Sequence, residues 1–331
     1  MLDTQEILGD RYKLKQQLGK NAGRQTWLAE DTLSESKQLV ILKLLAVSPQ
    51  TQWQELKLFE REAQVLANLN HPKIPQYLDY FSINQQANSG LPWFCLVQNY
   101  IPGKSLQQLL KEGRKFTEIE VRSFAIQVLN TIIYLHELSP PVLHRDIKPS
   151  NLILGEDYQI YLVDFGAVQD KAKAEGVTFT VVGTNGYVPP EQLWGKAVPA
   201  SDLYALGATL IHLLTGISPA DLSAQQMQIK FADKVQLNPS FTNWLEKLTA
   251  PAAEMRFNSA TEALQALQKP VLVNNHFVKN KDINCNRTVN YGHLLLLSLS
   301  GIALSFCVVV GVVYTFVNSI DRPQQRQDRI E

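Results

Sequence analysis

The sequence predicts an α+β fold, with a strand-rich first part followed by a helix-rich second part. Residues 11–18 alternate between polar and apolar side chains, the pattern of a half-buried strand, and residues 40–45 form a short buried-strand run. From Ser105 onward the apolar spacing becomes helical. Because strands and helices are segregated along the chain rather than alternating, we expect two lobes, one built on a sheet and one on helices.

Length and composition indicate a globular protein with balanced charge. The chain has 331 residues, of which 45% are hydrophobic and 19% charged, enough for one large domain or two medium ones. Its 31 basic and 31 acidic side chains cancel, so we expect no nucleic-acid partner. Cys95, Cys285 and Cys307 have no metal-ligand spacing and are odd in number, which argues against a zinc site or a disulfide framework.

The first part contains a lysine and a glutamate that each lie in an apolar setting. Residues 11–18 and 26–29 predict a hairpin, and Lys43 interrupts the buried run 40–45. Residues 51–69 predict a helix whose apolar stripe consists of Trp53, Leu56, Phe59, Leu66 and Leu69. Glu62 falls on that stripe. A buried charge is costly unless it is paired, so we expect Lys43 and Glu62 to form an ion pair.

The remaining elements follow from periodicity and from capping signals. Residues 75–81 and 93–100 predict two strands, and residues 101–103 a linker. Thr117 and Glu120 have the spacing of a capping box at the start of a helix. The predicted helices of the second part are residues 105–111, 117–137, 201–214, 225–231, 241–248 and 259–267.

Residues 144–151, His-Arg-Asp-Ile-Lys-Pro-Ser-Asn, form a polar loop between two apolar runs, 142–143 and 152–154. Asp164-Phe165-Gly166 follows shortly after. Asp146 could accept a hydroxyl proton, and Lys148 could screen a phosphate. Asn151 and Asp164 carry the oxygen ligands that Mg²⁺ prefers. This set of groups suits phosphoryl transfer, which needs an oriented hydroxyl, bound metal and neutralised phosphate charge.

The polar loop resembles the catalytic loop of protein kinases, H-R-D-L-x-x-x-N, with Ile147 in place of leucine, and residues 164–166 match the D-F-G motif. The resemblance covers about residues 12–268 and is strongest to bacterial, particularly cyanobacterial, eukaryotic-type serine/threonine kinases. It implies ATP and Mg²⁺ as cofactors and Ser/Thr-containing proteins as substrates. Asp146 would be the base, Asn151 and Asp164 the metal ligands, and Lys43 with Glu62 would align the phosphates of ATP.

The same resemblance implies domain limits and nucleotide contacts. Residues 1–11 would be a tail, 12–98 the N-lobe, and 99–269 the hinge and C-lobe. Gln98 would guard the back of the nucleotide pocket. The implied nucleotide-binding residues are Leu18, Gly19, Thr26, Ile41, Lys43, Asn99, Ile101 and Ile153.

Residues 164–191 resemble a kinase activation segment that ends in Pro-Pro-Glu. Thr178 and Thr180 are candidate sites of autophosphorylation, because a phosphothreonine there could pair with Arg145. By the same resemblance, Asp202 would hold the backbone of the polar loop, and Arg256 would pair with Glu191. The Lys148-Pro149 dipeptide favours serine/threonine over tyrosine specificity.

The glycine-rich loop departs from the family pattern G-x-G-x-x-G-x-V. Gly19 keeps the first glycine, but Asn21 and Arg24 replace the other two. Asn21 can adopt a left-handed backbone, and Arg24 could offer its side chain to phosphates in place of backbone amides. Above the adenine, Thr26 replaces the usual valine and Ile41 the usual alanine of the family, and this isoleucine narrows the adenine slot, so we expect weak ATP binding. These departures leave a pseudokinase scaffold or nucleotide-sensing module as the alternative, whereas the complete activation segment disfavours a small-molecule phosphotransferase.

The C-terminal region predicts a membrane anchor. Residues 270–293 read as a juxtamembrane linker, residues 294–317 carry no charge, and residues 318–331 form a short tail. At about 1.5 Å per residue, residues 294–317 would form a helix of roughly 36 Å, enough to cross a bilayer core of about 30 Å. We expect one span in the cell membrane, with the kinase domain cytoplasmic. Gly301 and Ser305 have the spacing that lets two such helices pack closely, so the hypothesis includes a homodimer.

Overall fold

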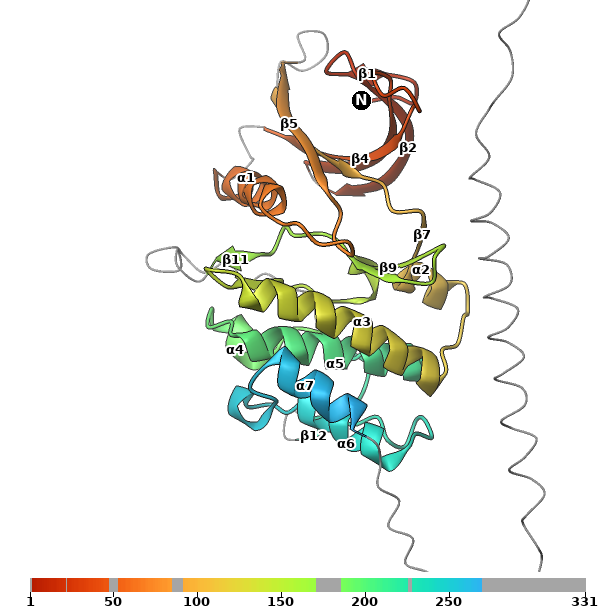
Figure 1. Cartoon of the computed structure of the whole chain (residues 1–331), viewed down its shortest axis with the longest axis vertical. Helices are drawn as coiled ribbons and strands as arrows, with labels where there is room; N and C mark the ends of the chain where they lie inside the picture. Colours follow the sequence, from red (N-terminus) through yellow and green to blue (C-terminus); the bar gives the residue numbers. More distant parts are fainter. Residues whose placement is uncertain are drawn as a thin grey trace, which may run out of the picture. The chain divides into compact units, whose positions relative to one another are not determined.

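The computed structural model describes residues 2–21, 23–47, 53–84, 92–170, 186–225 and 228–269. All of them belong to one compact unit, Met1–Leu272. Within this unit a curled sheet forms the N-terminal lobe and helices dominate the C-terminal lobe, as predicted (Figure 1). The C-terminal lobe also contains short strands that the apolar pattern did not reveal.

The N-terminal lobe is a six-stranded antiparallel sheet with the order β1-β2-β3-β4-β6-β5. Its strands are β1 (Ile7–Leu8), β2 (Tyr12–Asn21), β3 (Arg24–Asp31), β4 (Leu39–Ala46), β5 (Tyr77–Asn84) and β6 (Pro92–Asn99). On β4, Leu42 and Leu44 enter a core on one face of the sheet. Because side chains alternate along a strand, Lys43 and Leu45 face the other side, where Leu45 packs with Phe59 of α1 (Trp53–Ala67).

Two predictions about these segments were wrong. Trp53 was placed on the buried stripe of α1, but its side chain is 69% exposed, because it is the first residue of the helix and the packing against the sheet begins only at Leu56. Residues 225–231 do not form a helix. The structure has β12 (Ala224–Gln225) paired with β13 (Gln228–Ile229), and burial alternates from residue 228 to Phe231 with the two-residue period of a strand.

The C-terminal lobe is built around two long helices. Its helices are α2 (Leu106–Lys111), α3 (Glu118–Glu137), α4 (Pro190–Leu193), α5 (Pro199–Thr215), α6 (Pro239–Leu248) and α7 (Ala260–Gln268). The predicted capping box of Thr117 and Glu120 begins α3. Helix α3 packs against α5 and α7, and α5 is buried from Ala200 to Leu213, so it forms the centre of this lobe (Figure 1).

Short strands hold the polar loop at the top of this lobe. The loop runs between β8 (Val142–Leu143) and β9 (Leu152–Gly155), as the apolar runs predicted. β9 lies between β7 (Gly103–Ser105) and β10 (Ile160–Leu162), and β8 pairs with β11 (Gln169–Asp170). Glycine is required at position 103, where β7 pairs with β9, because a Cβ there would lie 2.3 Å from the carbonyl oxygen of Leu154.

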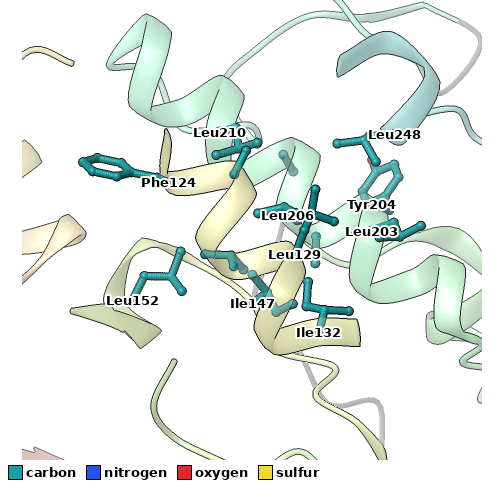
Figure 2. Close-up of a cluster of buried hydrophobic side chains, with 14 of the residues drawn as sticks. Phe124, Leu129, Ile132, Ile147, Leu152, Leu203, Tyr204, Leu206, Leu210 and Leu248 are labelled. Carbon is teal, nitrogen blue, oxygen red and sulfur yellow. The ribbon is translucent and has the colours of Figure 1, made fainter. Parts of the chain in front are cut away.

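An apolar side chain also anchors the polar loop to the core of the C-terminal lobe. Ile147 is 0% exposed and projects into the main core of the C-terminal lobe. Figure 2 shows it beside Leu129 and Ile132 of α3, with Leu206 of α5 nearby. The hydroxyl of Thr209 on α5 also donates to the carbonyl oxygen of Ile147 at 3.2 Å. The loop therefore rests on the helical core.

A buried ion pair joins the beginning of α4 to the segment after α6. The Arg256 guanidinium donates to both carboxylate oxygens of Glu191 and to the carbonyl oxygens of Ala200, Ala250 and Pro251. Its side chain is 0% exposed. The pair predicted by resemblance is thus present, and the Ser201 hydroxyl also donates to Glu191, at 2.7 Å.

We predict that Arg256→Ala lowers the free energy of unfolding of residues 1–272 by about 3–5 kcal/mol, because it leaves the largely buried Glu191 carboxylate without its countercharge and three carbonyl groups without their donor. Urea denaturation measures the change. Lys104→Ala is the matched control, since it removes an exposed pair with Glu112 and should cost less than about 1 kcal/mol. Equal losses in the two variants would show that the buried pair is not structurally important.

Candidate active site

The centre of the candidate site is an ion-pair cluster of Lys43, Glu62 and Asp164. The Lys43 Nζ donates to Oε1 of Glu62 on α1 and, at 2.7 Å, to Oδ1 of Asp164. Glu62 is 3% exposed and the Lys43 side chain 15% exposed. The predicted Lys43–Glu62 pair is therefore confirmed. The contact with Asp164 was not predicted, because 121 residues separate it from Lys43.

The charges of this cluster support one another. Burial alone would lower the pKa of Lys43, but the carboxylates of Asp164 and Glu62 outweigh it and raise that pKa, so the ammonium stays charged. The Lys43 charge in turn holds the pKa of Asp164 well below its usual range. Burial raises the pKa of Glu62, against the opposing charge of Lys43. Asp164 therefore remains an ionised carboxylate, and its side chain is 46% exposed to the cleft.

The polar loop brings together Asp146, Lys148 and Asn151. The Nζ of Lys148 lies 2.7 Å from Oδ2 of Asp146. The amide nitrogen of the Asn151 side chain donates to the Asp146 carbonyl at 2.8 Å and to its carboxylate at 3.0 Å. Asn151 is 4% exposed. The carboxylate of Asp146 is thus fixed from two sides at the surface of the loop.

Asp202, near the beginning of α5, fixes the backbone of the polar loop. Its buried carboxylate accepts the backbone N–H of His144 at 3.0 Å and that of Arg145 at 2.8 Å, and it contacts Nε2 of His136 at 2.9 Å. Although burial would raise the pKa of Asp202, the hydrogen bonds with His136 and with the Arg145 backbone lower it. Arg145 has a φ of +67°, a conformation that a residue other than glycine adopts only when its surroundings enforce it.

The Asp164-Phe165-Gly166 turn is fixed by its phenylalanine. Phe165 is 2% exposed, and its ring packs edge-on against the buried ring of His144 with centroids 5.0 Å apart. Asp164 itself has a φ of +68°. With Phe165 held in the core, this backbone turn directs the Asp164 carboxylate toward Lys43. Burial also lowers the pKa of His144, so its imidazole is neutral at pH 7.

A cavity of about 230 Å³ lies between the β2–β3 hairpin and the ion-pair cluster. Three of the predicted nucleotide-binding residues, Gly19, Thr26 and Lys43, line it, together with Arg24. The hairpin differs from the expectation in one respect. Asn21 ends β2 and has no positive φ, whereas Gly23 has a φ of +75°. The left-handed residue of the hairpin is therefore the glycine, which bears no steric cost.

The other predicted nucleotide-binding residues are not among those that line this cavity: Leu18, Ile41, Asn99, Ile101 and Ile153. Ile41 pairs with Gln98 across β4 and β6. The backbone N–H of Asn99 already donates to the carbonyl of Gln76 at 3.0 Å, and its side chain accepts from the Gln76 N–H. Their predicted contacts with adenine remain predictions.

The residues proposed for Mg²⁺ fit a hard cation. Asp164 offers an ionised, half-exposed carboxylate. Because the amide nitrogen of Asn151 donates to Asp146, the carbonyl oxygen of the same side chain is directed away from that carboxylate; it accepts from the Ser150 hydroxyl at 3.2 Å and keeps a second lone pair. One carboxylate and one carbonyl oxygen, with substrate phosphates completing the shell, is the donor set Mg²⁺ accepts in phosphoryl-transfer sites.

Several predicted features lie outside the described residues. They are the candidate phosphosites Thr178 and Thr180 in the segment 171–185, the linker 270–293, the apolar segment 294–317 and the tail 318–331. Among the helices that the structure does describe, none is long and apolar enough to span a bilayer. Membrane attachment, autophosphorylation and dimerisation therefore remain predictions.

The sequence did not predict two contacts that support the polar loop. The side-chain amide of Gln192 donates to the carbonyl of Arg145 at 2.7 Å, and His136 reaches Asp202 from the end of α3. Gln192 directly follows the Pro-Pro-Glu motif, so its position could have identified it. His136 lies in an ordinary helical pattern and carries no such signal.

Comparison with known proteins defines the family. The model of the protein kinase domain matches residues 12–273. Serine/threonine-protein kinase B of Synechocystis sp. is 36% identical, over 80% of this chain and 47% of its own length. Serine/threonine-protein kinase PknA of Nostoc sp. is 33% identical, over 81% and 49%. Serine/threonine-protein kinase D of Synechocystis sp. is 36% identical, over 78% and 52%.

The chain therefore belongs to the protein kinase family, and the resemblance to cyanobacterial members is confirmed. It spans about half the length of the curated relatives it matches.

Proposed function

We propose that this chain is a serine/threonine protein kinase that transfers the γ-phosphoryl group of ATP to hydroxyl groups of proteins. One observation carries the proposal: the Lys43 Nζ lies within hydrogen-bond distance of both Glu62 and Asp164. This arrangement aligns a cation and a metal-binding carboxylate at one end of the cleft. Asp146 is held by Lys148 and Asn151 in the same structure.

In the proposed reaction, the acceptor hydroxyl oxygen forms a bond to the γ-phosphorus of ATP. The bond between that phosphorus and the bridging oxygen breaks, and ADP leaves with the electron pair. The hydroxyl proton passes to the carboxylate of Asp146. Lys148, 2.7 Å from that carboxylate, screens the negative charge of the phosphoryl group as it moves.

Lys43 would contact the phosphates of ATP while Glu62 keeps its ammonium in place. Asp164 and Asn151 would hold Mg²⁺, which neutralises phosphate charge when bound. The rigid support of the polar loop suits this role, because small displacements of a catalytic group cost much of its effect. Asp202 and Ile147 supply that support.

Two features support serine or threonine as the acceptor. The polar loop contains Lys148-Pro149, and the curated relatives are serine/threonine-protein kinases. Autophosphorylation of Thr178 or Thr180 is part of the proposal, because a phosphate there would add charge that Arg145 could pair with.

We predict that Asp146→Asn lowers phosphoryl transfer to an acceptor protein by at least about 100-fold, because the proton acceptor is lost while the shape is kept. The assay measures label from γ-labelled ATP with Mg²⁺. Asp157→Asn, the same change at an exposed carboxylate, is the control and should keep full activity. Label that persists in Asp146→Asn would exclude this residue as the base. Absence of label in the unmodified chain would favour the pseudokinase alternative.

We also propose that residues 294–317 attach the chain to the cell membrane with the kinase domain cytoplasmic, and that Gly301 and Ser305 allow two copies to pair. The uncharged length of the segment supports attachment.

The full chain should float with lipid vesicles in a density gradient, whereas residues 1–272 should stay in the dense fraction. The full chain should stay bound to the vesicles in alkaline carbonate, because carbonate disrupts electrostatic contacts and these do not hold a spanning helix in the bilayer. Extraction of the full chain by carbonate would contradict a spanning helix.

A further inference from the structure

The face of the β2–β3 hairpin that covers the cavity is set by the strand register. Thr26 pairs with Gly19 and with Lys43, and Arg24 pairs with Asn21 and with Leu45. Directly opposed residues on neighbouring strands project to the same face, and residues two apart on one strand do so as well. Arg24 therefore shares the face of Lys43, above the ion-pair cluster.

Arg24 borders the same cavity as Lys43, Glu62 and Asp164. It is half-buried. Within the described part of the chain, no hydrogen bond or ion pair engages its guanidinium, although Glu62 and Asp164 each accept from Lys43. The Arg24 charge is still close enough to Glu62 to lower the pKa of that carboxyl, against the larger effect of burial.

The charges around the cavity explain what such a cation could do. Lys43 is shared by two carboxylates, so these three groups together carry one net negative charge, which opposes the approach of a polyphosphate. Arg24 offsets that charge on the face of Lys43, and Lys20 also lines the cavity. Its planar guanidinium can also donate two parallel hydrogen bonds to phosphate oxygens.

We propose that Arg24 binds the terminal phosphates of the nucleotide through its side chain, in place of the close backbone approach that a glycine at this position would allow. The inference rests on the proposed function, since it assigns a nucleoside polyphosphate to this cavity. It makes Arg24 a residue that distinguishes ATP and ADP from adenosine.

The test measures binding of Mg-ATP and of adenosine to the full chain in detergent by calorimetry. Arg24→Gln should weaken ATP binding by roughly 10- to 100-fold, the effect of removing hydrogen bonds to charged groups. Adenosine binding should not change, because adenosine lacks phosphates. Arg24→Lys should recover part of the loss, and the salt dependence of ATP binding should be smaller in Arg24→Gln than in the unmodified chain.

Lys15→Gln is the matched control on the same hairpin. Lys15 pairs with Glu30 at 2.7 Å and is not among the residues that line the cavity. This variant should bind ATP within about twofold of the unmodified chain, because its charge does not border the cavity.

The possible outcomes distinguish a failure of the role of Arg24 from a failure of the proposed function. If the unmodified chain binds ATP and transfers phosphate but Arg24→Gln binds ATP equally well, the role of Arg24 is overturned and the proposed function stands. A parallel loss of adenosine binding would also overturn it, because the effect would then be structural. If the unmodified chain binds no ATP, both proposals fail.

Discussion

The buried ammonium of Lys43 is stabilised by two carboxylates, and these two ion pairs connect the sheet of the N-terminal lobe to its helix α1 and to the C-terminal lobe. A charge on a buried strand is tolerated only when it is paired with good geometry. Glu62 provides one partner, which holds α1 at a fixed rotation against the sheet, and Asp164 provides the other from the C-terminal lobe. Strand β4, helix α1 and the turn at 164–166 are thus tied together by one nitrogen atom.

The polar loop achieves its rigidity by a different route. Its backbone is held by the buried carboxylate of Asp202, and the side chain of Ile147 is inserted in the helical core (Figure 2). Such a loop can expose Asp146 to the cleft without itself being mobile. Three hydrogen bonds offset the cost of burying the Asp202 carboxylate, which is not itself one of the reacting groups.

The sequence predicted those parts of the site that depend on local pattern or on a charge in an apolar setting. Lys43 and Glu62 were each anomalous in a periodic element, so their pairing could be inferred. The contact of Lys43 with Asp164 could not, because nothing local places the C-terminal lobe against β4. Likewise, Trp53 fits a helical stripe, but only the packed structure shows that the buried part of that stripe begins at Leu56. Residues 225–231 were predicted to be helical although Met227, Ile229 and Phe231 alternate with polar residues, which is the period of a strand.

A double-mutant cycle on phosphoryl transfer tests the central claim most directly, namely that Lys43 and Glu62 act as one unit. The rate constant kcat/KM would be compared for Lys43→Met, Glu62→Gln and the double variant. The structure predicts that the double variant is about as impaired as Lys43→Met alone, because Glu62 acts only through the lysine. Losses that simply multiply would contradict this account, since they would show that the two residues act independently.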